Sequence, residues 1–243
     1  MGNEIIICKN CGNHFYLKFC NNCGQKSDTH RITWKELFHH LPHAIFHLDE
    51  GFFYTIKQLI IRPGHALREY LLGKRKYFFN PFLMLILVTT LCTFLYVYFH
   101  FNTIIASVRL DKLEQQNIYI AHNYLAIRNV FFCLVCSIGD YLIFKKYKFN
   151  IPEMLVVNVF VFAEITVFQI LFIPLLFVGR SLYVIEYFGI IFVLLVFFYL
   201  FVVRYQFYET KNKLRLSINI FLSLGLYYFI GFIIAQQLIR KLI

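Results

Sequence analysis

The stretch "PEMLVVNVFVFAEITVFQILFIPLLFV", residues 152–178, is an almost unbroken apolar run, and it decides the fold class. It contains two acidic side chains and no Lys or Arg. Because an α-helix rises about 1.5 Å per residue, about 20 residues cross the roughly 30 Å hydrocarbon core of a bilayer. The run exceeds that length and therefore predicts a membrane-spanning helix.

Similar apolar runs lie on both sides of this stretch, separated by short charged segments. The composition agrees with a membrane protein, because 59% of the residues are hydrophobic and only 15% are charged, too few to cover a soluble domain of this size. The predicted fold class is an all-α polytopic membrane protein with a small N-terminal head. We expect five spans, at roughly residues 80–99, 127–144, 152–178, 182–203 and 216–238. The second span is the shortest, and the sequence leaves open whether it crosses fully.

The distribution of Lys and Arg predicts the orientation. With a cytoplasmic N-terminus, the inner segments hold 18 Lys and Arg residues and the outer segments hold 5. Positively charged segments stay in the cytoplasm, so we expect the N-terminus inside and the C-terminus outside. The inner segments in this arrangement are residues 1–79, 145–151 and 204–215.

Two Cys-x-x-Cys pairs stand near the N-terminus, each followed by glycine. Four thiolates at this spacing can form a closed tetrahedral zinc site, and a glycine after each pair permits the tight turn around the metal. A cytoplasmic location argues against disulfides, and no βαβ pattern indicates a redox motif. We therefore expect structural Zn²⁺ in a zinc ribbon over residues 1–27, with "NHFYLKF" as its hairpin. The predicted ligands are Cys8, Cys11, Cys20 and Cys23.

A histidine-rich segment follows the head. Three histidines at four-residue spacing share one helix face, which could bind a second metal or form a polar face near lipid headgroups. The second interpretation is favoured, because no Glu completes a zincin motif. The histidines are His39, His43 and His47.

The stretch "RPGHALREYLLGKRKYFFNP", residues 62–81, precedes the first span. Pro63 and Gly73 suit the start and end of a short amphipathic helix. Its position at headgroup depth favours contact with anionic lipid over nucleic acid, although the spacing also suggests a specific docked shape. The residues expected at the headgroups are Arg62, Arg68, Lys74, Arg75 and Lys76.

The order of these motifs resembles the bacterial Domain of Unknown Function 3667 family. The similarity runs through both Cys-x-x-Cys-Gly motifs, "HLDEGFFYTIKQLIIRPG" and "REYLLGKRKYFFNP", roughly residues 8–90. It implies a zinc-ribbon head on a multi-span protein of the bacterial inner membrane, and the four head cysteines as metal ligands. It implies no reaction. The expected organisation is a head at 1–27, juxtamembrane helices at 28–79 and a membrane domain at 80–243.

Several polar side chains lie within the predicted spans. A carboxylate at bilayer depth costs several kcal/mol unless it is paired, neutral or hydrated, so such residues are functional candidates by default. We expect Asp140, near the inner end of its span, to pair with Lys145 or Lys146. The intramembrane candidates are Glu164, Asn158, Gln169 and Asp140.

Three functions remain open on the sequence. The first is a non-enzymatic scaffold whose zinc head recruits a cytoplasmic protein. The second is a transporter or channel built around Glu164. The third is a membrane-bound metal enzyme that uses the histidine face. No catalytic motif is recognisable in the sequence, which favours the first function and gives no catalytic residue.

Overall fold

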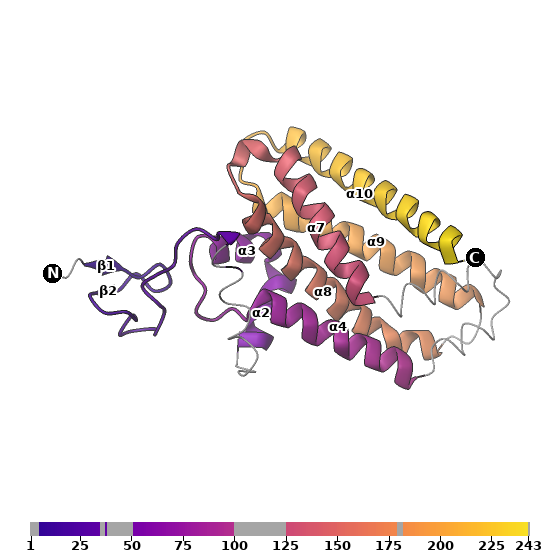
Figure 1. Ribbon diagram of the computed structural model, residues 1–243, viewed down its shortest axis with the longest axis horizontal. Helices are drawn as coiled ribbons and strands as arrows, with labels where there is room; N and C mark the ends of the chain where they lie inside the picture. Colours follow the sequence, from indigo (N-terminus) through magenta and orange to yellow (C-terminus); the bar gives the residue numbers. More distant parts are fainter. Residues whose placement is uncertain (1–4, 35–36, 38–50, 100–124, 179–181, 243) are drawn as a thin grey trace.

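The computed structural model describes residues 5–34, 37, 51–99, 125–178 and 182–242. Within these ranges the chain forms a two-stranded head and a bundle of long helices (Figure 1). The head lies at one end of the bundle, and the C-terminus lies at the other end. The strands are β1 (Ile6–Ile7) and β2 (His14–Phe15), and the short helices of the juxtamembrane region are α2 (Gly51–Ile61) and α3 (Pro63–Leu71).

Among the described residues, five helices are long and apolar enough to span a membrane, which confirms the predicted fold class. The second of them spans Leu125–Ile143, so the shortest predicted span is a complete helix. The helices are α4 (Pro81–Tyr98), α7 (Leu125–Ile143), α8 (Ile151–Val178), α9 (Leu182–Phe207) and α10 (Lys213–Leu242). A single 3-10 turn, η2 (Lys145–Tyr147), connects α7 to α8. Helix α9 continues beyond its predicted end at residue 203, and this extension places Arg204 inside the helix.

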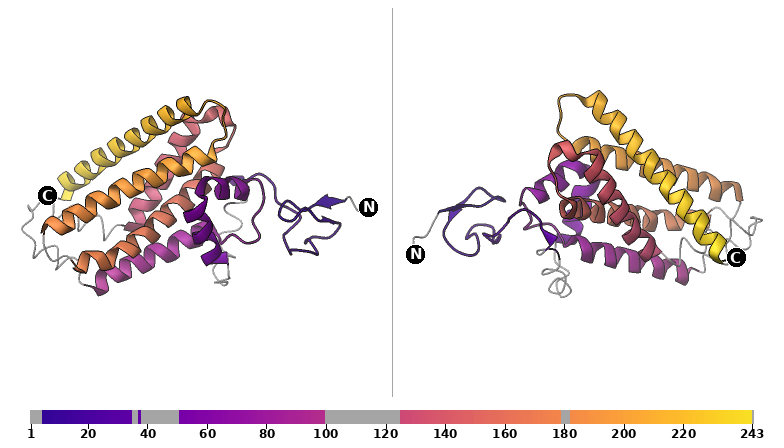
Figure 2. Two further views of the ribbon diagram at one scale, coloured as in Figure 1. Left: turned by 180° about the vertical axis from the view of Figure 1, so that it is seen from behind. Right: turned by 45° about the horizontal axis from the view of Figure 1, so that its top comes forward.

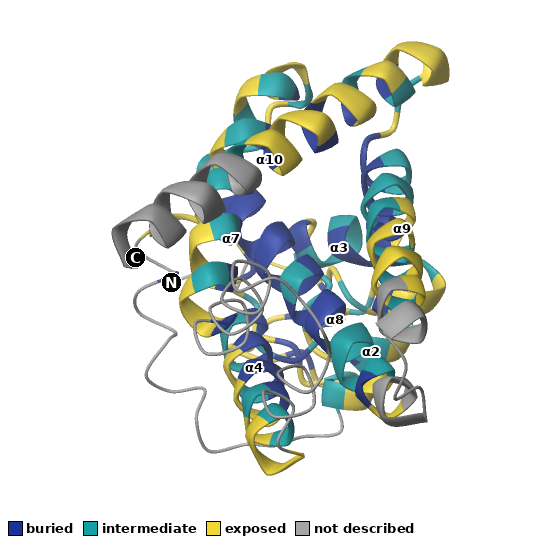
Figure 3. Cartoon of the chain, turned by 90° about the vertical axis from the view of Figure 1, so that its right-hand side faces the viewer, coloured by how far each residue is buried: buried dark blue, intermediate teal, exposed yellow. Residues whose placement is uncertain are grey.

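Helix α8 is the centre of the bundle. In its membrane window 61% of the residues are buried, against 17% for α9. Helices α4, α7 and α9 contact it directly, and α10 packs on α7 and α9. Figure 3 shows that buried residues are concentrated on α8 and that exposed residues lie on the outer helices. The outer faces carry exposed apolar side chains such as Ile190, Leu194 and Phe198, as expected for helices that face lipid.

Two helix starts follow from local capping. At α4 the Asn80 side chain accepts hydrogen bonds from the backbone N–H of Phe82 and Leu83, at 3.0 and 3.1 Å, while Pro81 occupies the first turn. At α8 the Asn150 backbone N–H donates to the Glu153 carboxylate, and the Glu153 backbone N–H donates to the Asn150 side-chain oxygen, both at 2.8 Å. This arrangement is a capping box with Asn in the place of Ser or Thr.

The short helices lie at the end of the bundle nearest the head, as the two views of Figure 2 show. Thr55 of α2 donates to the Gly51 carbonyl and accepts from the Phe79 backbone N–H, at 2.7 and 2.8 Å. This buried hydroxyl ties α2 to the segment that leads into α4. Helix α3 packs against the end of α9.

The contact between α3 and α9 requires a glycine. A Cβ on Gly64 would overlap the Val203 carbonyl oxygen and the Phe207 backbone nitrogen of α9. The Gly64 N–H also donates to the Gln206 Oε1 atom at 3.1 Å. A side chain at this position would therefore push α3 off the bundle.

Gly64→Ala is expected to lower the free energy of unfolding by about 1–3 kcal/mol, because the added methyl group overpacks a backbone contact. The measurement is the thermal unfolding midpoint of the full chain in detergent. Gly225→Ala on α10 is the matched control, since no atom of the described residues that could clash lies within 4 Å of an added Cβ there. Alanine favours a helix over glycine, so this control should keep or raise the midpoint. Equal midpoints for the two variants would contradict the close approach.

Candidate metal centre and intramembrane polar sites

The four predicted cysteines come together in the head. Their Sγ atoms lie within 4.8 Å of one another. The closest pairs are Cys8 with Cys23 at 3.5 Å and Cys11 with Cys20 at 3.6 Å, far beyond the roughly 2.05 Å of a disulfide. A tetrahedral metal with bonds of about 2.3 Å would set its sulfurs roughly 3.8 Å apart. The four thiols therefore form a set that could hold a metal ion.

Two equivalent turns position these thiols. The Gly12 N–H bonds the Cys8 carbonyl and the Gly24 N–H bonds the Cys20 carbonyl, both at 2.8 Å. The two glycines have φ angles of 75° and 72°, in the left-handed region that favours glycine. The glycines after each Cys pair thus have the conformation that the sequence predicted.

The hairpin of the head differs from the prediction. Strand β2, which begins in "NHFYLKF", pairs with β1 ahead of the first cysteine, and Ile6 lies opposite Phe15. The first turn therefore sits at the tip of the hairpin, and the rest of "NHFYLKF" leads to the second turn. The segment is too short to fold back on itself, so it takes its partner from the residues before Cys8.

The turns also change the acidity of the thiols. Burial acts to raise the pKa of Cys20, but backbone N–H groups of Cys23 and Asn22 outweigh it and lower that pKa to about 6. Burial raises the pKa of Cys8 to about 11. The second turn thus stabilises a thiolate, the form that binds metal.

The segment after the head is docked onto the bundle. The Gln25 Oε1 atom accepts from the backbone N–H groups of Arg75 and Lys76, at 3.1 and 3.3 Å. Arg31 forms two hydrogen bonds of 2.8 Å with the carboxylate of Glu153. The Asn150 side chain donates to the Ile32 carbonyl at 3.0 Å. Residues 25–32, which we call the docking segment, therefore fix the head relative to the segment between α3 and α4 and to the start of α8.

The basic strip makes specific contacts with protein. Arg62 binds both carboxylate oxygens of Glu69 at 3.1 Å, and Lys74 binds the same residue at 3.3 Å. Arg68 reaches the Phe207 carbonyl at 3.2 Å and Glu209 at 3.0 Å. These contacts give the strip a docked shape of the kind that its spacing suggested, while its contact with lipid headgroups stays a prediction.

Arg75 belongs to the same docked strip. Its guanidinium donates to the His30 carbonyl at 2.8 Å and lies 5.5 Å from the centre of the Tyr70 ring. Lys76 is exposed. Sequence reasoning missed Gln25, Glu69 and Glu209 as the partners of this strip, because nothing in the sequence around each residue marks it as a contact.

Asp140 pairs with Arg204, and the predicted pairing with Lys145 or Lys146 is wrong. Both carboxylate oxygens of Asp140 accept from the Arg204 guanidinium at 3.1 Å. The Asn158 amide donates to the same carboxylate at 3.1 Å, and the Tyr227 hydroxyl donates at 3.0 Å. The four side chains come from α7, α9, α8 and α10, and we call them the buried network.

The extension of α9 explains this correction. The sequence pattern places Arg204 in an inner loop, but the residue lies in α9 and its side chain is 4% exposed. It therefore points into the bundle at the depth of Asp140. The sequence did carry a signal for this pair. Asp140 and Arg204 each lie within a few residues of the inner end of an apolar run.

The other two intramembrane candidates lie outside the buried network. Glu164 is completely buried, and neither of its carboxylate oxygens has a hydrogen-bond partner among the described residues. Within the same residues, the Gln169 Oε1 atom and the Tyr199 hydroxyl are also buried without partners. The structure thus groups Asp140 with Asn158 and places Glu164 apart from them.

The predicted histidine face cannot be compared with the structure. His39, His43 and His47 lie outside the described residues. In the described part of the chain, the head cysteines are the group of His, Cys, Asp and Glu residues that could hold a metal.

Arg204→Gln is expected to destabilise the protein by about 3–5 kcal/mol, because it leaves the Asp140 carboxylate buried without its cation. The combined Asp140→Asn and Arg204→Gln variant should recover much of this loss, since both charges are then absent. Thermal unfolding midpoints in detergent measure the effect. Arg215→Gln, at an exposed position at the start of α10, is the matched control and should stay within about 0.5 kcal/mol. A double variant less stable than Arg204→Gln would contradict the ion-pair interpretation.

Comparison with known proteins identifies one region of the chain. No curated protein and no solved structure matches the chain. Residues 49–93 match the family described as "Protein of unknown function (DUF3667)". The match covers α2, α3 and most of α4, while the cysteine head lies outside it. This match confirms the resemblance of the chain to the DUF3667 family.

Proposed function

We propose that this protein is a non-enzymatic membrane scaffold whose zinc-bound head recruits a cytoplasmic protein. The observation that carries the proposal is the closed set of four thiols on a head that is docked to the bundle. Four cysteine ligands leave no open position for a substrate, which is typical of structural zinc. A head of this size has too small a core to fold without such support.

The surface of the head supports a role in recruitment. Leu17 is 68% exposed, Ile7 60%, Tyr16 54% and Phe19 52%. We call these four residues the head patch. Lys18 and Lys26 are exposed beside it. Aromatic and aliphatic residues next to positive charge fit a partner surface with an apolar pocket and an acidic rim.

The contacts at the head end of the bundle support the proposal that the head is cytoplasmic. Arg31 of the docking segment contacts Glu153 next to the loop at 145–151. Arg68 of the basic strip contacts Glu209, in the segment 204–215. The three segments that were expected inside therefore meet at one end of the bundle, which is the arrangement that the distribution of Lys and Arg favours.

Leu17→Glu is expected to abolish recruitment but leave one Zn²⁺ per chain, because it changes only the head patch. Cys20→Ser should lose both the metal and recruitment, because it removes a ligand and unfolds the head. The measurements are metal content of the purified chain in detergent and the set of proteins labelled by a proximity enzyme fused to the N-terminus. Cys92→Ser, at a buried position in α4, is the control and should retain both.

The outcomes separate metal binding from recruitment. An unchanged labelled set for Leu17→Glu would contradict recruitment by the head patch. No Zn²⁺ in the wild-type chain under reducing, zinc-replete conditions would contradict the zinc head.

A second candidate function rests on Glu164. A carboxylate that is fully buried in a spanning helix, with no hydrogen-bond partner in the part of the chain that the structure describes, is a typical feature of proton or ion pathways. The alternative is a transporter or channel in which this acid binds the moving species. The enzyme alternative at the histidine face rests on sequence alone.

Glu164→Gln is expected to abolish proton flux if the transporter alternative is correct, because the amide cannot release a proton. The measurement is the pH inside dye-loaded proteoliposomes under a potassium diffusion potential. Asn158→Asp, about 1.7 turns away on α8, is a useful comparison because it adds an acid within the buried network. Wild-type vesicles that are no more permeable to protons than empty vesicles would rule out this function.

A further inference from the structure

An open cavity of about 420 Å³ lies inside the bundle. Its volume falls in the range of about 300–1,000 Å³ that is usual for small-molecule sites. Described side chains of α7, α8, α9 and α10 line it, and each of these helices is long and apolar enough to span a membrane. The cavity therefore lies at membrane depth, where a molecule that enters from the bilayer is soluble in lipid. None of the functions proposed above uses it.

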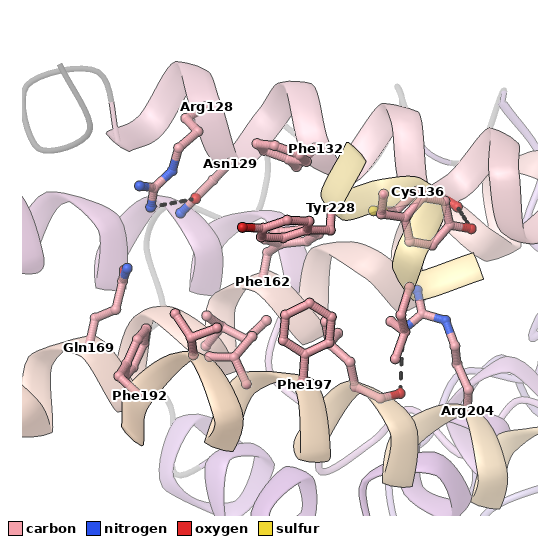
Figure 4. Close-up of a pocket in the computed structure, with 16 residues that line it drawn as sticks. Arg128, Asn129, Phe132, Cys136, Phe162, Gln169, Phe192, Phe197, Arg204 and Tyr228 are labelled. Atoms are coloured by element: carbon pink, nitrogen blue, oxygen red, sulfur yellow. Dashed lines mark hydrogen bonds between the residues drawn. The ribbon is translucent and has the colours of Figure 1, made fainter. Parts of the chain in front are cut away.

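The cavity is elongated, and its walls are largely aromatic. On α9 the lining residues run from Phe192 to Arg204, which corresponds to about 18 Å along the helix. Figure 4 shows aromatic side chains from several helices directed toward one another across the space. A long apolar space suits an extended hydrocarbon chain better than a hydrated solute, because the chain keeps water away from the rings and gives up no hydration of its own. The aromatic wall residues are Phe132, Phe162, Phe192, Phe197, Tyr227 and Tyr228.

The charged groups at both ends of the cavity bind other protein groups. At the end nearest the head, Arg204 forms an ion pair with Asp140. At the opposite end, the Arg128 guanidinium donates to the Asn129 side-chain oxygen at 3.5 Å, and the Asn129 amide donates in turn to the Thr166 hydroxyl at 3.1 Å. A ligand of this cavity therefore needs no charge to complement either arginine.

Gln169 of α8 supplies a neutral polar group to the wall. Its Oε1 atom is buried without a partner among the described residues, and Figure 4 shows the side chain extending toward α7 with its amide nitrogen at the tip. Gln169 lies five residues before Pro174, where the apolar window of α8 ends opposite the head, so about 8 Å separates it from that end. Lipid ester carbonyls lie at the edge of the hydrocarbon core, at a comparable depth. An ester carbonyl is therefore the acceptor that this amide N–H would meet in a bilayer.

We propose that this cavity binds one acyl chain of a membrane glycerolipid, with the chain along the aromatic walls and its ester carbonyl accepting a hydrogen bond from the Gln169 amide. The headgroup then lies outside the cavity, so recognition depends on the chain and the ester and not on charge. The site is separate from the basic strip at the head end, where headgroup contacts were predicted. It stands independently of recruitment by the head, because its walls and its amide donor belong to α7–α10.

The test uses the full chain in phosphatidylcholine nanodiscs that contain a trace of phosphatidylcholine with a photoreactive group on its chain. One probe has ester-linked chains, and the other has ether-linked chains of the same length, which lack the carbonyl. After illumination, mass spectrometry locates the adducts on α7 and α9. The ester probe should label cavity residues about five-fold more than the ether probe, since one neutral hydrogen bond contributes about 1 kcal/mol. Gln169→Leu should lower labelling by the ester probe to the level of the ether probe.

A pair of variants on α9 separates the cavity from the general lipid surface. Val196→Trp fills the cavity and should remove labelling of its walls by both probes. Leu194→Trp, two residues earlier at a side chain that is 63% exposed, adds the same ring to the outer face and should leave labelling unchanged. Thermal unfolding midpoints in detergent check that both variants are folded.

Two results would overturn the proposal. The first is equal labelling of the cavity by the ester and ether probes in the wild-type chain, which would mean that the carbonyl is not recognised. This comparison needs no variant, so it decides the question even if Val196→Trp fails to fold. The second is unchanged labelling of α7 and α9 in a folded Val196→Trp, which would place the lipid on the outer surface. Because the readout is lipid labelling, failure here leaves recruitment by the head patch untouched.

Discussion

The ion pair between Asp140 and Arg204 sets the arrangement of the membrane helices. Two charges inside a bundle are costly unless each finds its partners, and here Asn158 and Tyr227 complete the set. Because these four side chains come from four helices, α7, α8, α9 and α10 must meet at one depth. Small relative shifts of any of the four would leave a buried charge with fewer hydrogen bonds.

Several of the hydrogen bonds and ion pairs that join the helices lie at the head end of the bundle. The buried network lies there, and so do the capping box of α8 and the contact of Arg31 with Glu153. Glu153 takes part in two of these interactions, since it caps α8 and also binds the docking segment. Toward the opposite end, the Asn129 amide of α7 donates to the Thr166 hydroxyl of α8 at 3.1 Å, and the other described contacts between these helices are largely apolar.

Local patterns in the sequence predicted the elements, and distant contacts decided their partners. Apolar run length was enough to predict five helices, and Cys-x-x-Cys-Gly spacing was enough to predict the metal set, because both depend on neighbouring residues. The choice of Arg204 over Lys145 for Asp140 depends on how far α9 extends and which face it presents. Gln25 likewise became part of the docking surface only because the chain folds back onto Arg75 and Lys76. Neither outcome can be read from a local window of sequence.

The segment shared with the family gives the scaffold proposal a physical basis. Residues 49–93 include α2 and α3, which lie at the end of the bundle nearest the head. In this segment Gly64 allows α3 to touch the backbone of α9, and Thr55 joins α2 to the start of α4. Arg75 then holds the docking segment through the His30 carbonyl. These contacts suit the proposed scaffold, because they place the head patch at a defined position relative to the bundle.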